Sequence, residues 1–301
     1  MKTTTVWIYL ILANLFWAGN YIFGDHLLSE MAPLWITFSR WLLAVIILIP
    51  LAFFVEKPQW HKVRKELLPL LIMGITGIIG YNYFLLIALQ YTTATNAALV
   101  SAVNPGIIII FSFFALHEKL TKIQVAGLIV SLLGVMVIIT KGKFELLFEA
   151  NNNRGDLMML LVIVVWGIYS IIGKKVTTPP ITATAVSSLF AIMILVPFLF
   201  LEGAHFAQIS QLSIIGIIYM AVFPCVLSFI FWNIAVKVLG ASKTGISLNL
   251  IPAFTAIIAV VLGEKITVEQ IIGGLLVFIG IYLTSGLVYR QSYNTNKTMN
   301  S

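Results

Sequence analysis

Aromatic and amide side chains recur at a few points inside long apolar stretches of this sequence. Trp17, Asn20 and Tyr21 lie within five positions of each other in the first stretch. Rings and amides bind small molecules through contact and hydrogen bonds, and an apolar pocket with few polar groups is typical of such sites. Such rings also pack cores and line membrane interfaces, so both interpretations stay open. The candidate cavity residues are Trp17, Asn20, Tyr21, Asn82, Tyr83, Asn104, Trp166, Tyr169, Ser228, Trp232 and Asn249.

Two of these amides lie beside prolines. Asn104 directly precedes Pro105, and Asn249 lies three positions before Pro252. Proline inside a helix removes one backbone hydrogen bond and bends the helix. Each amide either satisfies the freed backbone groups or forms, with the bend, a binding and hinge element. We predict that Pro105 and Pro252 are paired hinges.

Arg40 is the only basic residue well inside an apolar stretch. It follows Pro33 by seven positions, which places it about 10 Å deep at 1.5 Å per helical residue. One interpretation makes it the partner of a carboxylate on an amino-acid substrate. The other is structural: the side chain snorkels toward the outer interface or bonds backbone carbonyls.

The composition indicates the surroundings of these residues. Hydrophobic residues make up 60% of the 301 positions and charged residues 10%, with a mean hydropathy of +1.04, whereas a soluble domain carries about 25% charged residues. Spanning a bilayer takes about 20 apolar residues, and the backbone must bond within itself, which favours helices. We predict an all-α integral membrane protein with ten spans, near residues 6–24, 34–55, 67–90, 95–116, 123–140, 156–173, 181–201, 212–236, 244–263 and 268–288.

The net charge of +7 comes mostly from short loops between these spans, which favours membrane orientation over nucleic-acid binding. With the N-terminus inside, thirteen of the 18 Lys and Arg residues face the cytoplasm and four face outside. Both termini are therefore predicted to be cytoplasmic. The inside residues are Lys2, Lys57, Lys62, Arg64, Lys65, Lys119, Lys122, Lys174, Lys175, Lys237, Lys243, Arg290 and Lys297, and the outside residues are Lys141, Lys143, Arg154 and Lys265.

Catalytic and metal-binding patterns are absent from the sequence. The four His residues lie near span ends or in loops, and neither HExxH nor GxSxG occurs. Without a base beside a nucleophile, catalysis has no candidates, and we expect no cofactor or metal. No Asp or Glu lies in the middle third of a predicted span, which argues against proton exchange on a buried carboxylate.

An internal repeat organises the chain. Each half would hold five spans, and an odd number turns the second half upside down in the bilayer, which is typical of secondary transporters with a site near the midplane. The predicted units are residues 1–145, residues 150–290 and a cytoplasmic tail over 291–301. The repeated pairs are Pro105 and Pro252 at 147 positions, Glu118 and Glu264 at 146, Trp17 and Trp166 at 149, and the glycines Gly127 with Gly273 and Gly134 with Gly280.

These motifs carry a family resemblance. The first span contains LFWAGNYIFGDHL, the second contains SRWLLAVIILIP, and each half has a Pro…Glu-Lys…Gly…Gly stretch. Over nearly all of residues 6–288 the chain resembles a two-repeat EamA-domain member of the drug/metabolite transporter superfamily. The resemblance implies ten helices around a central cavity, alternating access by rocking of helix hairpins, and packing of the fifth span against the tenth through their glycines. It also makes the second span peripheral, which favours the structural interpretation of Arg40.

We therefore expect a secondary transporter that exports small neutral or zwitterionic metabolites such as amino acids. The alternatives are proton-coupled multidrug efflux and, from other classes, a membrane receptor or a membrane enzyme. The expected location is the plasma membrane, of the bacterial inner-membrane type. The expected partners are a small-molecule substrate and the lipid bilayer, without nucleic acid, and a monomer is compatible with this interpretation.

Overall fold

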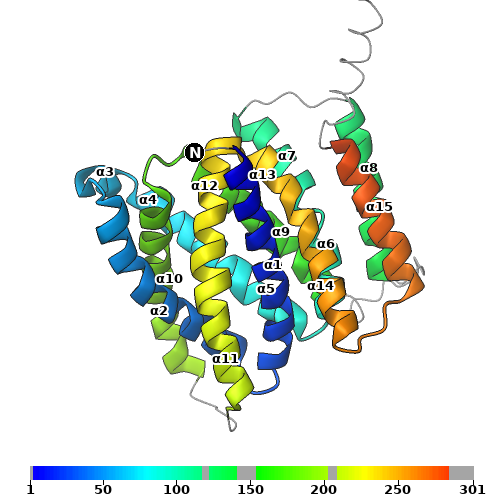
Figure 1. Ribbon diagram of the computed structural model, residues 1–301, viewed down its shortest axis with the longest axis horizontal. Coiled ribbons are helices and arrows are strands. Elements are labelled where there is room, and N and C mark those ends of the chain that lie inside the picture. The colour runs from blue at the N-terminus through cyan, green and yellow to red at the C-terminus, as the bar shows by residue number, and fades with distance from the viewer. Residues whose placement is uncertain (1–2, 117–121, 141–153, 203–208, 285–301) are drawn as a thin grey trace, which may run out of the picture.

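The computed structural model describes residues 3–116, 122–140, 154–202 and 209–284, and within those ranges it contains helices and no strand (Figure 1). The predicted Glu-Lys turn at Glu118, the outside loop over 141–153 and the tail over 291–301 lie outside the described residues. The elements of the first half are α1 (Thr3–Leu27), α2 (Pro33–Leu51), η1 (Ala52–Glu56), α3 (Trp60–Lys65), α4 (Leu67–Met73), η2 (Gly74–Gly80), α5 (Tyr81–Leu89), α6 (Ala94–Ser101), α7 (Asn104–Leu116) and α8 (Lys122–Thr140). Those of the second are α9 (Arg154–Lys175), α10 (Pro180–Glu202), α11 (Gln211–Met220), η4 (Ala221–Ser228), α12 (Phe229–Leu239), α13 (Ala241–Gly245), η5 (Ile246–Asn249), α14 (Leu250–Val261) and α15 (Val268–Thr284).

Eight helical runs among the described residues are long and apolar enough to cross a membrane. They overlap eight of the ten predicted spans, and most of them extend a few residues beyond the predicted bounds. The other two predicted spans, 123–140 and 268–288, contain shorter apolar helical stretches, Val125–Ile138 and Val268–Gly280. Large apolar side chains remain on the outside of the bundle, and Phe200 and Leu201 are each 83% exposed. Such a surface suits contact with lipid, and the chain is a multi-pass helical membrane protein.

Three of the runs contain a widened π-helical segment. Two of these segments, η2 and η4, begin 147 positions apart, at Gly74 and Ala221, and so occupy equivalent places in the repeat. A Cβ atom on Gly77 of η2 would lie 2.1 Å from the ring of Tyr169. The glycine therefore lets α9 approach this segment closely. Single-turn π segments inside α-helices occur frequently at functional sites.

The helices of the two halves pack on each other in a reciprocal pattern. Helix α1 contacts η4, α12 and α14, whereas α9 contacts η2, α5 and α7. Helix α2 packs along α10, and α8 packs along α15 at one edge of the bundle (Figure 1). A Cβ on Gly134 would lie 2.6 Å from the carbonyl oxygen of Gly273, so the two backbones nearly touch there. The predicted glycine-mediated packing of these two helices is confirmed.

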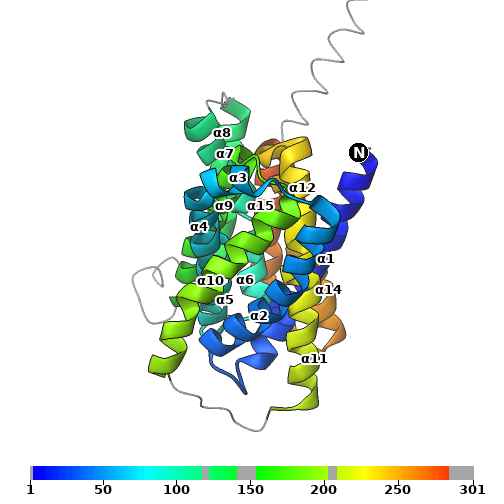
Figure 2. The same ribbon diagram turned by 90° about the vertical axis from the view of Figure 1, so that its left-hand side faces the viewer.

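The two ends of the bundle carry different connections (Figure 2). The N-terminus, helix α3 and the start of α10 lie at one end, which we call the N-terminal end. The start of α11 lies at the opposite end, as does the turn between α1 and α2. Each run crosses from one end to the other, so residues near the middle of the runs form a common core.

Candidate functional site

Aromatic rings from both halves meet in this core. The ring centroid of Trp166 lies 5.3 Å from that of Trp17 and 5.3 Å from that of Trp232, and Tyr169 stacks on Trp166 at 4.9 Å. Sequence reasoning missed Tyr81 and Phe229, although they lie 148 positions apart at the repeat-related starts of α5 and α12. No member of the group is more than 4% exposed. We call Trp17, Tyr81, Trp166, Tyr169, Phe229 and Trp232 the ring cluster.

Three polar residues of the first half join beside the ring cluster. Arg40 of α2 donates from Nη1 to Asn20 Oδ1 of α1 at 2.6 Å, and from Nη2 to Asn82 Oδ1 of α5 at 2.9 Å. The amide of Asn82 in turn donates to the carbonyls of Gly77 and Ile78 in the π segment. All three side chains are buried, and Arg40 has no exposed surface. The interpretation that Arg40 snorkels toward the interface is therefore wrong, and Arg40 donates to amide side chains rather than to backbone carbonyls.

The second half has an equivalent polar group without a charge. Asn233 lies 151 positions after Asn82 and donates from Nδ2 to the Tyr169 hydroxyl at 2.7 Å and to Thr184 Oγ1 at 3.0 Å. These contacts join α12, α9 and α10, as Arg40 and its partners join α5, α1 and α2. The repeat register does not predict this pairing, because Tyr81 and Phe229 of the same two helices lie 148 positions apart, whereas Asn82 and Asn233 lie 151 apart. Neither Asn233 nor Thr184 is distinctive in the sequence alone.

The predicted proline sites coincide with breaks in two helical runs. The turn at residues 102–103 separates α6 from α7, directly before Asn104 and Pro105. In the second half, the tighter helix η5 ends at Asn249, and Pro252 lies in the first turn of α14. The Oδ1 atoms of Asn104 and Asn249 are buried and accept no hydrogen bond. The structure thus places the breaks where the hinges are predicted.

The remaining candidates take separate positions. Tyr21 reaches the core, where its hydroxyl lies 3.4 Å from that of Tyr81. The Ser228 hydroxyl contacts the carbonyls of Ala13 and Phe223, which places it between α1 and the π segment. Tyr83 lies away from the ring cluster, in a groove of about 480 Å³ on the side of the bundle. The groove also contains Leu34 and Phe198 and separates α5 from α2 and α10.

Two carboxylates at the N-terminal end hold the connection between α9 and α10. Glu66 accepts hydrogen bonds from the backbone N–H and hydroxyl groups of both Thr177 and Thr178, at 2.5 to 2.9 Å. Glu56 accepts from Ile181 N, Thr182 N and the Thr182 hydroxyl at 2.7 to 2.9 Å. The positive end of the α10 helix dipole favours the negative charge of a carboxylate at the start of this helix. We call Glu56, Glu66, Thr177, Thr178 and Thr182 the carboxylate clamp.

The clamp determines the protonation state of Glu66. Burial raises the pKa of the carboxyl, but the hydrogen bonds from Thr178 and Thr177 outweigh burial and lower the pKa from 4.5 to about 2. The side chain of Lys237, at the end of α12, donates to the Thr178 carbonyl and so extends the contact to a further helix. Glu66 is therefore ionised at neutral pH, and its charge stabilises the contact between the two halves at the N-terminal end.

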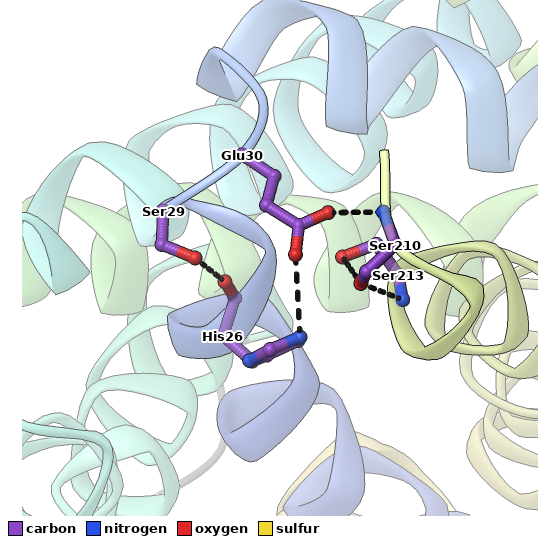
Figure 3. A network of polar contacts seen from close by, with 5 residues as sticks. All are labelled: His26, Ser29, Glu30, Ser210 and Ser213. Atoms are coloured by element: carbon purple, nitrogen blue, oxygen red, sulfur yellow. Dashed lines mark hydrogen bonds and ion pairs between the residues drawn. The ribbon is translucent and has the colours of Figure 1, made fainter. Parts of the chain in front are cut away.

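A smaller contact of the same kind links the two halves at the opposite end (Figure 3). Glu30, between α1 and α2, accepts a hydrogen bond from the backbone N–H of Ser210 at 2.7 Å, and Ser210 caps α11. The backbone N–H and hydroxyl of Ser210, together with the Ser213 hydroxyl, lower the pKa of Glu30. His26 Nε2 lies 3.9 Å from the second carboxylate oxygen. At each end, a carboxylate of the first half thus binds the start of a helix of the second half.

The comparisons agree with this architecture. The family profile described as "EamA-like transporter family" matches residues 4–140 and 153–286. YyaM of Bacillus subtilis (strain 168), an uncharacterized transporter, is 30% identical over 301 residues, covering 99% of each chain. An uncharacterized transporter of Archaeoglobus fulgidus is 29% identical over 283 residues, covering 92% of this chain and 96% of its own. A solved crystal structure has a TM-score of 0.69 at 21% identity, covers 96% of this chain and 99% of the other, and shows the fold alone.

Fold, site and relatives together define the class as a membrane transporter. The chain belongs to the EamA-like transporter family, and the resemblance predicted from its motifs is confirmed. Within the described ranges, no group of three or more His, Cys, Asp or Glu residues has an arrangement suited to a metal ion.

Proposed function

We propose that this protein is a secondary transporter that exports small neutral or zwitterionic metabolites, such as amino acids, by alternating access. In this proposal all ten helical runs cross the plasma membrane, with both termini in the cytoplasm, and α8 and α15 supply the fifth and tenth spans. The two halves form inverted repeats. The substrate binds at the ring cluster and the polar residues beside it.

The observation that carries the proposal is the composition of the core. Candidate cavity residues from both halves, among them Trp17, Trp166 and Trp232, meet in one buried cluster at the interface between the halves. If these residues only packed the core, their buried donors and acceptors would be expected to have hydrogen-bond partners. Yet Trp166 Nε1, Trp232 Nε1 and Asn104 Oδ1 are buried without a partner. An unpaired buried polar group is destabilising, and a ligand that bonds to it removes that cost.

The reciprocal packing supports the inverted repeat and the alternating mechanism. Helix α1 packs on the equivalents of the helices that α9 packs on, as a two-fold relation in the membrane plane predicts. The contacts at the two ends also pair the first half with the second: Glu66 binds the α9–α10 connection, and Glu30 binds the start of α11. In the proposed cycle, release of the clamp opens the cytoplasmic side, and release of Glu30 opens the outside.

The substrate class follows from the charges near the core. The ring cluster and the amides bonded to Arg40 include no Asp or Glu. A cationic drug lacks a counter-charge in such a site, so neutral and zwitterionic molecules fit better. Aromatic walls and amide groups suit an amphipathic metabolite, because they provide both apolar contact and hydrogen bonds.

The test is counterflow in liposomes. Purified protein is reconstituted, the liposomes are loaded with a mixture of unlabelled amino acids, and the uptake of each labelled amino acid is measured. The wild-type protein should exchange at least one of them faster than protein-free liposomes. Trp166→Ala should abolish this exchange, whereas Trp60→Ala, on the exposed surface of α3, should retain it. Equal exchange by Trp166→Ala and Trp60→Ala would show that the ring cluster is not the binding site.

A further inference from the structure

Arg40 is a buried cation without an anion. Its side chain has no exposed surface, and among the residues that the structure describes no carboxylate lies within ion-pair distance of its guanidinium. Two of its nitrogens bond to neutral amide oxygens, of Asn20 and Asn82, and its Nε atom has no partner. A charge removed from water is strongly disfavoured unless it is paired and fully hydrogen-bonded. Arg40 meets neither condition.

Bundle packing does not explain this charge. In the second half, Asn233 joins Tyr169 and Thr184 across the three equivalent helices by neutral hydrogen bonds. The residue 147 positions after Arg40 is Ser187, which is buried and small. The same bridging of helices is thus achieved in one half without a cation, so the cation in the other half needs a separate reason.

Further unpaired donors accompany Arg40. The indole Nε1 atoms of Trp41, Trp166 and Trp232 are buried and have no acceptor. The two groups are adjacent: the Tyr81 ring lies 4.8 Å from that of Trp166, and Asn82, the next residue in the chain, accepts a hydrogen bond from Arg40. Arg40 Nε and these three indole N–H groups therefore lack acceptors, and a negatively charged acceptor would also balance the charge of Arg40.

We infer that Arg40 is the binding site for a carboxylate on the transported molecule, whose apolar part lies against the ring cluster. This deepens the proposed function, on which it rests, because it narrows the substrate to amphipathic molecules that carry a carboxylate, such as zwitterionic amino acids. A carboxylate matches guanidinium geometry and presents several acceptor sites. It supplies the missing charge and the acceptor for Nε. An amide in its place supplies an acceptor but no charge.

The experiment compares a carboxylate with its neutral isostere. The probes are 3-phenylpropionate against 3-phenylpropionamide, and hexanoate against hexanamide, added to the purified full-length protein in detergent. Binding is read from tryptophan fluorescence and from thermal unfolding. In the wild-type protein at least one carboxylate should bind tenfold or more tightly than its amide. Arg40→Gln should reduce that ratio to about one, and Arg64→Gln, an exposed control on α3, should leave it unchanged.

Two further variants test the inference if Arg40→Gln fails to fold. Arg40→Lys keeps the charge and should keep the preference for the carboxylate, whereas Trp166→Phe keeps a ring but removes one donor and should weaken carboxylate binding more than amide binding. Equal affinity for both members of each pair in the wild-type protein, or no saturable binding of either carboxylate, overturns the inference. So does a preference that survives in Arg40→Gln.

Liposome counterflow with the same probes separates this inference from the proposed function. Binding of the carboxylate without its exchange contradicts transport but supports the Arg40 site. Exchange of amides and carboxylates at equal rates supports transport and contradicts the Arg40 site.

Discussion

Replacing Glu66 with glutamine should loosen the N-terminal end of the bundle. In the closed structure one carboxylate oxygen accepts both donors of Thr177, and the other accepts both donors of Thr178. Glutamine keeps one of these oxygens and replaces the other with an amino group. The amino group cannot accept a hydrogen bond, so one threonine loses the oxygen that accepts both of its hydrogen bonds, and its N–H is left unpaired.

The shifted pKa of Glu66 gives the size of the effect. A change from 4.5 to about 2 corresponds to roughly 3.4 kcal/mol at about 1.36 kcal/mol per pKa unit. The carboxylate is only partly buried, and solvent screening reduces this to roughly 1 to 2 kcal/mol. The expected shift in the balance between closed and open N-terminal ends is therefore about fivefold to thirtyfold toward open.

A cysteine behind the clamp measures this balance. Ser187 lies on α10, five residues beyond Thr182, and is fully buried against Gly74 of the first half. The Ser187→Cys variant is made in a Cys225→Ser background. Its rate of reaction with a small impermeant thiol reagent is then measured at pH 7 in inside-out vesicles. Adding Glu66→Gln should raise this rate about fivefold to thirtyfold.

The control for this experiment is Glu264→Gln, in the turn before α15, which should leave the rate unchanged. The sign of the pH effect also follows from the lowered pKa. The stabilisation by Glu66 is complete above its ordinary pKa of 4.5 and is lost as the pH falls toward about 2. Between pH 6 and 8 the charge of Glu66 should therefore not alter the closed state. An equal rate with and without Glu66→Gln, in well-folded protein, would refute the role of the clamp.

Three other predictions concern mechanism and topology. Pro105→Ala and Pro252→Ala should fold and insert but slow liposome flux, with turnover changed more than substrate affinity, because alanine restores a backbone donor at the hinge; unchanged turnover in both leaves the prolines as packing features. Flux should not depend on a pH gradient, since no mid-span carboxylate is available to carry a proton, and flux that collapses when the gradient is removed, at constant substrate charge, contradicts this. In intact cells an impermeant thiol reagent should label Gln211→Cys but not Gln59→Cys, and the reverse pattern would invert the proposed topology.

The sequence predicts four of the six residues of the ring cluster, because their signal is local. Aromatic and amide residues stand out in apolar helices, and the repeat places Trp17 and Trp166 in equivalent positions. Both reach the core in the structure, at 5.3 Å from each other. Tyr83 shows the limit of this signal. It is adjacent to Asn82 in the chain, but successive helical residues point about 100° apart, so it lies in the lateral groove instead.

The sequence pattern does not predict the polar contacts, because they join distant parts of the chain. The partners of Arg40 lie 20 and 42 positions away, on two other helices. Those of Glu66 lie 111 and 112 positions away, so the sequence presents Glu66 only as a loop charge. The close packing of the π segment η2 against α9 also joins distant parts of the chain. Gly77, for example, matters because the Tyr169 ring lies against it.

Alternating access to a single buried position is the central claim, and one labelling measurement tests it directly. Ser228 is buried at the end of η4, next to Phe229 of the ring cluster, and cysteine is close to serine in size. In a Cys225→Ser background, Ser228→Cys is exposed to a small impermeant thiol reagent in right-side-out and in inside-out vesicles. We predict reaction from both sides, slowed from both sides by a transported substrate. Reaction from one side only, or from neither, would contradict alternating access at this site.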